Sequence, residues 1–328
     1  MKVLITGGAG FIGTAIAKRL MDRGDAVVLV DNFNDYYDPQ LKEDRIKKFL
    51  KGYRNKRGED KKGKFTLYRA DIRERRAMER IFAKERPRKV VHLAAMAGVR
   101  SSLEDPVLYA DVNVVGTTNL LDLAVRHKIK NFVYASSSSV YGGNTKVPFS
   151  ETDSVEKPIS PYAATKRATE LLAHTFSHLY GLKTTGLRYF TVYGPWGRPD
   201  MALFLFADAI TKGAPIKVFN RGKMSRNFTY IDDIASGTIT VLDADLPCDV
   251  MNIGGDREET LMDYIRTLEA AMGRTVKKRY LAMQPGDVPK TVADISKLRA
   301  LGWAPTTRID TGIAQFVAWY KIYYKIVN

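Results

Sequence analysis

A short apolar run near the start of the chain leads directly into a turn rich in glycine. Residues 2–6, Lys-Val-Leu-Ile-Thr, have the length and composition of a β-strand. Residues 7–13 then read Gly-Gly-Ala-Gly-Phe-Ile-Gly, and a helical pattern continues from Phe11 to Arg23. A strand, a glycine turn and a helix in this order fit few architectures. The sequence therefore predicts that the chain starts with the β-α unit of a nucleotide-binding fold.

Three glycines of the turn, spaced three residues apart, have separate roles in such a unit. Gly7 permits the tight turn, Gly10 lets backbone amides approach a diphosphate, and Gly13 allows the helix to pack closely. The amino terminus of the helix favours negative charge. Asp31, 18 residues after Gly13, ends the second predicted strand and can accept hydrogen bonds from an adenosine ribose. These residues predict a dinucleotide site, and a purely structural turn is the weaker alternative.

The residues near Asp31 bear on which dinucleotide is bound. Asn32 and Phe33 follow it, in place of the Arg that accommodates a 2′-phosphate, so NAD is favoured over its phosphorylated form. Asp71 and Ile72 come just after the third predicted strand, where they can meet the edge of the adenine. An ordinary helix cap at Asp71 explains these residues nearly as well, and both interpretations stay open.

Strand-length apolar runs alternate with helical patterns through the first half of the chain. We expect strands at residues 2–6, 27–31, 65–69, 89–93, 131–136 and 183–187. We expect helices at residues 11–23, 72–84, 106–126 and 161–180, the last two with Pro at their first position. This alternation predicts an α/β fold with a Rossmann-type, doubly wound parallel sheet in residues 1–190. Shorter strands and scattered helices, including residues 260–272 and 310–325, predict a smaller mixed α/β lobe in residues 191–328, with some segments returning to the first domain.

A serine-rich segment and a Tyr-Lys pair supply candidate catalytic side chains. Residues 136–142, Ser-Ser-Ser-Ser-Val-Tyr-Gly, come at the end of the fifth predicted strand. Tyr162 and Lys166 are spaced i, i+4 at the start of the next long helix and share one of its faces. The ammonium can then lower the pKa of the phenol, and a phenolate can act as a base. The spacing alone is common by chance, so its value comes from its place in a dinucleotide fold.

These motifs together resemble the extended short-chain dehydrogenase/reductase family, whose members act on nucleotide sugars. The resemblance covers nearly the whole chain, with further matches at residues 92–95 (His-Leu-Ala-Ala), 188–190 (Arg-Tyr-Phe), 226–233 (Arg-Asn-Phe-Thr-Tyr-Ile-Asp-Asp) and 286–287 (Gly-Asp). Residues 31–39 and 190–201 resemble the UDP-glucuronate 4-epimerases within that family. The resemblance implies an isomerase that converts UDP-glucuronate to UDP-galacturonate with NAD, through a 4-keto intermediate.

The resemblance also implies a role for each candidate side chain. Tyr162 would take the proton of the sugar's 4-hydroxyl, Ser137 would hydrogen-bond the reacting oxygen, and Lys166 would hold the nicotinamide ribose and tune Tyr162. The implied cofactor site consists of Gly7, Gly10, Phe11, Ile12, Gly13, Asp31, Asn32, Asp71, Ile72, Leu93, Ala94, Ala95, Tyr162 and Lys166.

A uronic acid substrate must be held by its carboxylate, because a 4-keto-glucuronate is a β-keto acid that loses carbon dioxide readily. By resemblance, Arg198 is the candidate for a bidentate clamp. The other implied substrate-binding residues are Ser138, Ser139 and Thr191 as neutral donors, Arg226 and Asp287 at the diphosphate and the uridine ribose, and Val218 and Phe219 at the uracil.

Missing carboxylates separate this chain from related enzymes. Decarboxylases of the family carry Glu where this chain has Ser139, and dehydratases carry an Asp-Glu pair where it has Ser138 and Ser139. A UDP-galactose/UDP-glucose 4-epimerase is the alternative enzyme, although Gln284 and Thr191 depart from the residues often found in those relatives. A dinucleotide-sensing or RNA-binding relative without catalysis is more remote, because it would not need Tyr162 and its partners.

The chain carries 52 Lys and Arg against 36 Asp and Glu, a net charge of +16. Residues 42–64 hold 11 basic and 4 acidic residues and form an insertion in the cofactor-binding half. Its basic groups could attract NAD or a UDP-sugar, which are both anionic, but an exposed, salt-screened face without specific contacts is the default expectation. Nucleic acid is the less favoured partner.

Several further expectations concern location and assembly. The single cysteine, Cys248, favours a reducing compartment, and the apolar run at the amino terminus is too short for a signal peptide. Because no stretch of about 18 apolar residues occurs, we expect a cytoplasmic protein without a membrane partner. We expect no metal site, since His174 and His178 lack a third ligand nearby. Family resemblance implies a homodimer through the helices at residues 106–126 and 161–180.

Overall fold

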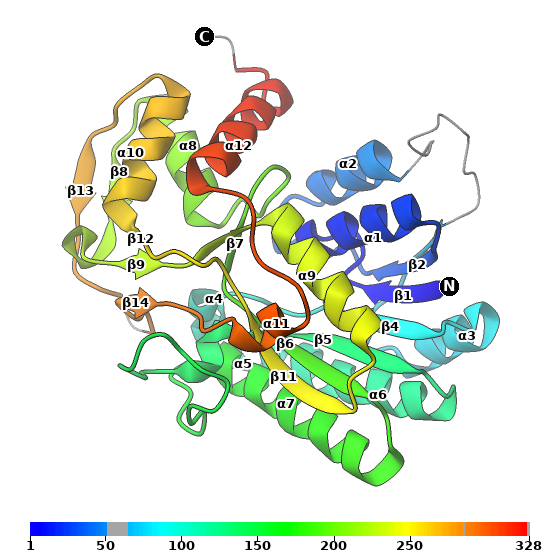
Figure 1. Cartoon of the computed structure of the whole chain (residues 1–328). Helices are drawn as coiled ribbons and strands as arrows, with labels where there is room; N and C mark the ends of the chain where they lie inside the picture. Colours follow the sequence, from blue (N-terminus) through cyan, green and yellow to red (C-terminus); the bar gives the residue numbers. More distant parts are fainter. Residues whose placement is uncertain (51–64, 285, 327–328) are drawn as a thin grey trace.

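The computed structural model describes residues 1–50, 65–284 and 286–326. A seven-stranded sheet runs through it in the order β11-β6-β5-β4-β1-β2-β3, and every neighbouring pair is parallel. Its strands are β1 (Lys2–Thr6), β2 (Ala26–Asp31), β3 (Phe65–Arg69), β4 (Lys89–His92), β5 (Asn131–Ser137), β6 (Thr184–Tyr189) and β11 (Cys248–Ile253). The predicted parallel sheet is confirmed, and Figure 1 shows it crossing the middle of the molecule.

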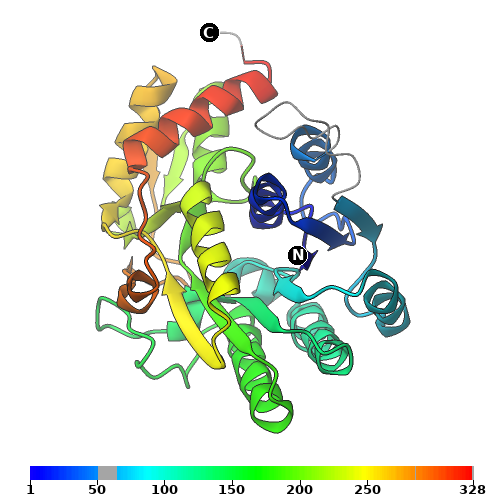
Figure 2. The ribbon, with the colours of Figure 1, turned by 45° about the vertical axis from the view of Figure 1, so that its right-hand side comes forward.

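Helices cover both faces of this sheet, as Figures 1 and 2 show from two directions. One face carries α1 (Phe11–Arg23), α2 (Gln40–Phe49) and α9 (Ile231–Ala244), and the other carries α3 (Arg75–Glu85), α5 (Pro106–Ala110), α6 (Gly116–Arg126) and α7 (Pro161–Tyr180). Parallel strands need such crossover connections, and the helices bury both faces. The chain returns to this layer late, since α9 and β11 come after a first part of the smaller lobe and before the rest of it in sequence.

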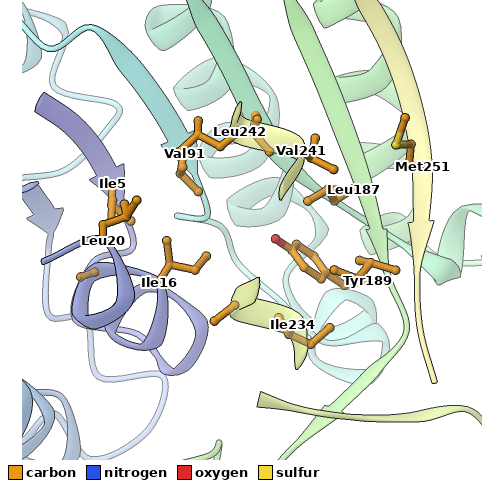
Figure 3. Packing of buried hydrophobic residues seen from close by; sticks show 14 of the residues in the cluster. Ile5, Ile16, Leu20, Val91, Leu187, Tyr189, Ile234, Val241, Leu242 and Met251 are labelled. Atoms are coloured by element: carbon orange, nitrogen blue, oxygen red, sulfur yellow. The ribbon is translucent and has the colours of Figure 1, made fainter. Parts of the chain in front are cut away.

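The layer between α1, α9 and the sheet is fully buried (Figure 3). Ile16 and Leu20 of α1 and Ile234 of α9 face Ile5 and Leu187 of the strands, and none of the five has exposed surface. Burial of each such side chain contributes about 1.5–3 kcal/mol to stability. This packing fixes the amino end of α1 beside the carboxyl end of β1, where the glycine turn lies.

A smaller lobe contains α8 (Ala202–Lys212), α10 (Leu261–Met272) and α12 (Ile309–Tyr323), which Figure 1 shows together at one side of the sheet. Its short strands pair as β7 (Thr191–Tyr193) with β10 (Phe228–Tyr230), β8 (Ile216–Val218) with β13 (Lys278–Tyr280), and β9 (Ser225–Arg226) with both β12 (Glu259–Thr260) and β14 (Lys290–Thr291). The lobe has its own apolar core, in which the rings of Phe204 and Phe316 meet edge to face at 4.9 Å. The other short helices are α4 (Val99–Glu104), α11 (Ser296–Ala300) and the 3-10 helices at Ser138–Tyr141 and Phe219–Gly222.

The helices that the sequence predicted agree with the structure except in two places. α1 and α7 have the predicted bounds. The helix expected over residues 106–126 is instead α5, a π-helical turn at Asp111–Val115, and α6. Asn113 within this turn hydrogen-bonds the backbone of Met96 and the hydroxyl of Thr165, contacts that a sequence pattern does not reveal. The helix expected from residue 72 begins at Arg75, so Ile72 lies before it.

In the part of the chain that the structure describes, no helix combines the length and the apolar character needed to cross a bilayer.

Candidate active site

A cavity of about 1660 Å³ lies at the carboxyl ends of the central strands. The glycine turn, the ends of β2 and β5, the amino end of α7 and segments of the smaller lobe line it. Open α/β sheets bind ligands at this edge. The structure brings together on this cavity every residue that the sequence suggested for cofactor, catalysis or substrate, with the exception of Val218.

The glycine turn forms a close-fitting cradle. Gly7 has φ +68°, and a Cβ on Gly13 would lie only 2.3 Å from the carbonyl oxygen of Gly7. A Cβ on Gly7 would lie 2.9 Å from the amide nitrogen of Ala94. α1 starts at Phe11 after Gly10, with no side-chain cap and no acidic residue in its first turn. Its free amides and the positive end of its dipole therefore fit the diphosphate of a dinucleotide.

Asp31 stands beside this cradle in a fixed orientation. Its Oδ2 accepts a hydrogen bond from the amide of Ala9 at 3.1 Å, and its Oδ1 accepts one from the amide of Phe33 at 2.9 Å. The ammonium of Lys42 in α2 adds an ion pair at 3.3 Å. A carboxylate has about four acceptor positions and three are used here, so Asp31 keeps capacity for one ribose hydroxyl.

Asn32 and Asp71 form the next part of the cavity wall. The amide of Asn32 donates to Asp71 Oδ2 at 2.9 Å, and the guanidinium of Arg73 donates to the same oxygen at 2.9 Å. Although burial opposes the effect, hydrogen bonds from Arg73 and Asn32 lower the pKa of Asp71. α3 takes Glu74 as its N-cap residue, so the helix-cap interpretation of Asp71 is wrong; Asp71 is among the residues that line the cavity.

Tyr162, Lys166 and Ser137 meet where α7 begins and β5 ends. Burial raises the pKa of Tyr162, and the Ser137 hydroxyl and the charge of Arg198 partly offset this. Burial lowers the pKa of Lys166 to about 8. Its ammonium donates to the carbonyl oxygen of Ala135 at 2.8 Å. The expected lowering of the Tyr162 pKa by Lys166 is therefore wrong in this structure, because burial dominates both groups.

A buried ion pair holds α7 against the sheet behind these side chains. Glu170 of α7 accepts two hydrogen bonds from Arg188 of β6, both at 2.9 Å. It also accepts one from the hydroxyl of Ser136 at 2.6 Å. Glu170 and Arg188 are each about 3% exposed. Since Lys166 lies one turn before Glu170 in α7, this network fixes the position of Lys166 relative to β5. The sequence motif includes Arg188, but sequence reasoning missed its pairing with Glu170.

Arg198 reaches the same cavity with a carboxylate already beside it. Its Nε and Nη2 donate to the two oxygens of Asp200 at 3.0 and 2.5 Å. The guanidinium lies 5.4 Å from the centre of the Tyr36 ring. Although burial opposes it, the charge of Asp200 raises the pKa of Arg198. Arg198 is thus a fixed, charged donor at the cavity, and Asp200 is a site residue that sequence reasoning missed. The hydroxyl residues Ser138, Ser139 and Thr191 line the same cavity.

Arg226 and Asp287 line the part of the cavity formed by the smaller lobe. Burial lowers the pKa of Arg226, whose guanidinium donates to the backbone carbonyls of residues 288–289. Asp287 forms an ion pair with Arg100 of α4 at 2.9 Å. Arg100 also lies 4.8 Å from the centre of the Phe219 ring. Sequence reasoning missed Arg100, because its contacts join two segments far apart in the chain.

Two expectations about ligand contacts have different outcomes. The side chain of Val218 does not line the cavity, because it is fully buried in the core of the smaller lobe. Phe219, the next residue, does line it.

Among the described residues, no group of three or more His, Cys, Asp or Glu is placed to hold a metal ion. His174 instead lies 3.9 Å from the sulfur of Cys248.

The basic segment at residues 42–64 is not simply an exposed face. Its first eight residues belong to α2, and Lys42 and Arg45 of that helix are buried. α2 turns these two side chains toward the glycine turn, so the expected absence of specific contacts is wrong for them. Residues 51–64 lie outside the part of the chain that the structure describes.

Known proteins resemble this chain over most of its length. A model of the NAD dependent epimerase/dehydratase family matches residues 3–254. A UDP-glucuronate 4-epimerase of Thermodesulfobacterium geofontis (strain OPF15) is 45% identical, over 97% of this chain and 95% of that protein. The structure of a UDP-glucuronic acid 4-epimerase from Bacillus cereus, in complex with UDP-glucuronic acid and NAD, is 33% identical with a TM-score of 0.90, over 99% of this chain and 100% of that one.

A UDP-glucose 4-epimerase from Thermotoga maritima, solved with UDP-glucose, is also similar. It is 31% identical with a TM-score of 0.86, over 99% of this chain and 100% of that one. The family model and these identities agree with the resemblance in the sequence motifs. The chain belongs to the NAD dependent epimerase/dehydratase family.

Proposed function

We propose that this protein is a UDP-glucuronate 4-epimerase, which interconverts UDP-glucuronate and UDP-galacturonate with NAD through a 4-keto intermediate. The observation that carries the proposal is that Arg198 opens on the same cavity as Tyr162, Lys166 and the glycine turn. One ligand can therefore place a carboxylate at Arg198 and a reacting hydroxyl at Tyr162. The relatives named for this activity support the proposal.

The cradle residues fit NAD, and each has a part in holding it. The amino end of α1 would bind the diphosphate, Asp31 the adenosine ribose, and Lys166 the nicotinamide ribose. When bound, NAD supplies the acceptor, and later the donor, of the hydride of carbon 4. The residues at the other wall of the cradle are Leu93, Ala94 and Ala95.

Tyr162 is the proposed proton acceptor for the 4-hydroxyl. Burial keeps the proton on its Oη, and the nearby Ser137 hydroxyl and Arg198 charge pull in the opposite direction. Only the phenolate of Tyr162 can take a proton, so this side chain must be ionised when the sugar is oxidised; it returns the proton it has taken when the sugar is reduced. Ser137 would hydrogen-bond the sugar's 4-oxygen and so hold it within reach of Tyr162.

Retention of the carboxylate follows from the residues around it. Arg198 offers a fixed guanidinium; its Nε and Nη2 bind Asp200 by two parallel hydrogen bonds, so the sugar carboxylate would share or replace this partner. Ser138 and Ser139 present neutral hydroxyls to the cavity where related decarboxylases and dehydratases carry acids. Arg198 would thus bind the carboxylate of a β-keto acid intermediate. Neither Ser138 nor Ser139 would place a carboxylic acid beside it.

One observation favours a second candidate, a UDP-galactose/UDP-glucose 4-epimerase. Arg198 already has a carboxylate partner in Asp200, so a neutral hexose could bind without leaving the guanidinium unpaired. The two candidates differ in what happens to this pair: a uronate must share or replace Asp200, and a hexose leaves it alone.

The proposed reaction is tested by incubating purified protein with NAD and UDP-glucuronate and separating the nucleotide sugars. We expect an equilibrium mixture of UDP-glucuronate and UDP-galacturonate. The same mixture should form when the reaction starts from UDP-galacturonate. The Tyr162→Phe variant should form UDP-galacturonate far more slowly than the wild type. It should still bind UDP-glucuronate. Unchanged UDP-glucuronate with the wild-type protein would contradict the proposal.

We also propose a homodimer through the helices α5, α6 and α7. Large apolar side chains are exposed on the first and last of these helices, with Val107 76%, Leu171 52% and Leu179 60% exposed. Large apolar side chains exposed on neighbouring helices are typical of a subunit interface. Light scattering should give the mass of a dimer, and Leu171→Glu should shift it toward the monomer.

We further propose a division of roles between the two parts of the chain. Residues 1–190 would hold NAD and residues 191–328 mainly the UDP-sugar, while α9 and β11 return to the central sheet. A cytoplasmic location is proposed because the chain's one cysteine, Cys248, is an exposed free thiol.

A further inference from the structure

Arg45 of α2 is a buried cation that contacts mainly backbone carbonyls. Its Nε donates to the carbonyl oxygen of Trp196 at 2.9 Å, and its Nη2 donates to that of Gly197 at 2.9 Å. Its Nη1 reaches the carbonyl oxygen of Ala9 at 3.3 Å and the hydroxyl of Tyr37 at 2.7 Å. The side chain has no exposed surface. Within the described residues it contacts no carboxylate, so these carbonyls, the hydroxyl and the Tyr37 ring, 5.4 Å from the guanidinium, offset the loss of hydration.

The loop that Arg45 holds carries unusual backbone geometry. Trp196 has φ +63°, a left-handed conformation that is costly for a bulky residue. Such a conformation persists only where its surroundings determine it. The indole packs against three rings, with centroids 5.6 Å from Phe49, 5.1 Å from Trp319 and 5.0 Å from Tyr323. The loop is therefore held from two sides, by these rings and by the guanidinium of Arg45.

Arg45 connects two segments of the site: the glycine turn of the proposed cofactor site and the loop that leads to Arg198. Ala9 belongs to the glycine turn, next to Gly10. Gly197 immediately precedes Arg198, so the carbonyl held by Arg45 is in the peptide bond that leads to the clamp residue. The planar guanidinium, with five donors in fixed directions, can bridge both segments at once, which a lysine ammonium cannot do with the same geometry.

We propose that Arg45 is a positioning residue for the substrate carboxylate: it locks the loop at residues 196–198 to the cofactor turn and so fixes where Arg198 presents its guanidinium. This inference rests on the proposed function, because it takes Arg198 as the group that binds a uronate. It also gives a role to part of the basic segment, which net charge alone left without one. Loss of the bridge should impair recognition of the carboxylate more than binding of the UDP group, which the proposed function assigns to the smaller lobe.

The test compares the NAD-loaded wild type with Arg45→Met, and with Lys48→Met as a matched control on the exposed side of α2. The affinity for UDP-glucuronate and for UDP-glucose is measured by calorimetry, together with the NAD retained per chain. For Arg45→Met we expect NAD to be retained, the affinity for UDP-glucuronate to fall at least tenfold, and that for UDP-glucose to change less than threefold. Lys48→Met should leave all three quantities unchanged.

Other outcomes separate the inference from the proposed function. Equal loss of both affinities in Arg45→Met, or no loss, would overturn the positioning role while the proposed function stands. Equal affinity of the wild type for the two nucleotide sugars would overturn both. If Arg45→Met does not fold, Arg45→Lys decides the question: it keeps the charge but cannot span both segments, so a selective loss supports the inference and wild-type selectivity overturns it.

Discussion

Replacement of Lys166 by Met should stabilise the NAD-free protein at neutral pH while it abolishes activity. Lys166 is 5% exposed, and burial lowers its pKa from 10.5 to about 8. At pH 7 the fold therefore holds an ammonium in a place that disfavours charge. In the proposed function Lys166 holds the nicotinamide ribose, and this role would come at the expense of stability.

The magnitude follows from the two pKa values. A difference between 10.5 and about 8 corresponds to about 3 kcal/mol of lost stability at pH 7. The Met variant also loses the hydrogen bond to Ala135, worth about 1 kcal/mol, so the net gain is about 2 kcal/mol. Because the folded-state pKa lies below the unfolded value, the unfolded wild type binds more protons between about pH 8 and pH 10.5. Wild-type stability thus rises through this window, and the advantage of the variant shrinks by about 1 kcal/mol between pH 7 and pH 9.

Urea unfolding of NAD-free protein at pH 7 and pH 9 measures both quantities. Lys48→Met removes an exposed lysine of α2 and should give no comparable gain. A Lys166→Met variant that is less stable than the wild type at pH 7 would refute the reasoning. So would an advantage that stays constant or grows between pH 7 and pH 9.

Three further predictions concern the turn, the base and the buried ion pair. Gly13→Ala places a Cβ against backbone, so NAD retention should be lost and stability should fall by about 1–3 kcal/mol. The control is Gly143→Ala, whose Cβ meets no atom within 4 Å. It should change neither the NAD content nor the midpoint of urea unfolding. Tyr162→Phe should lower kcat by about a thousandfold with the Kd for UDP-glucuronate within threefold, and a comparable loss of binding would contradict its role as base. Glu170→Gln leaves the charge of Arg188 buried without a carboxylate, and urea unfolding should show a loss of about 3–5 kcal/mol; an unchanged midpoint would show that the pair is dispensable.

The elements that the sequence predicted well are those whose ends are set locally. α1 lies between a glycine turn and Gly24, which adopts the left-handed conformation at its carboxyl end. α7 begins with Pro161 after a Ser160 cap and ends before Gly181, also left-handed. These signals need only neighbouring residues, and so a single sequence reveals them.

The features that escaped prediction depend on contacts between distant segments. Burial of Arg45 requires the carbonyls of residues 196–197, about 150 positions away, and nothing in the composition of a basic segment indicates them. The pairing of Asp287 with Arg100 likewise joins two lobes. The resemblance implied Val218 and Phe219 together at the uracil, but Val218 ends β8 with its side chain in the core of the smaller lobe, and only Phe219 lines the cavity. Asp200 lay within a recognised motif, and only the fold shows that its carboxylate meets Arg198.

The central claim is that the cavity is built for a sugar carboxylate. The most direct measurement is kcat/KM of the NAD-loaded wild type for UDP-glucuronate and, separately, for UDP-glucose. A charge-assisted hydrogen-bonded contact at Arg198 is worth about 1.5–3 kcal/mol, so we predict a preference for UDP-glucuronate of about tenfold or more. Equal values for the two substrates, or a preference for UDP-glucose, would contradict the account.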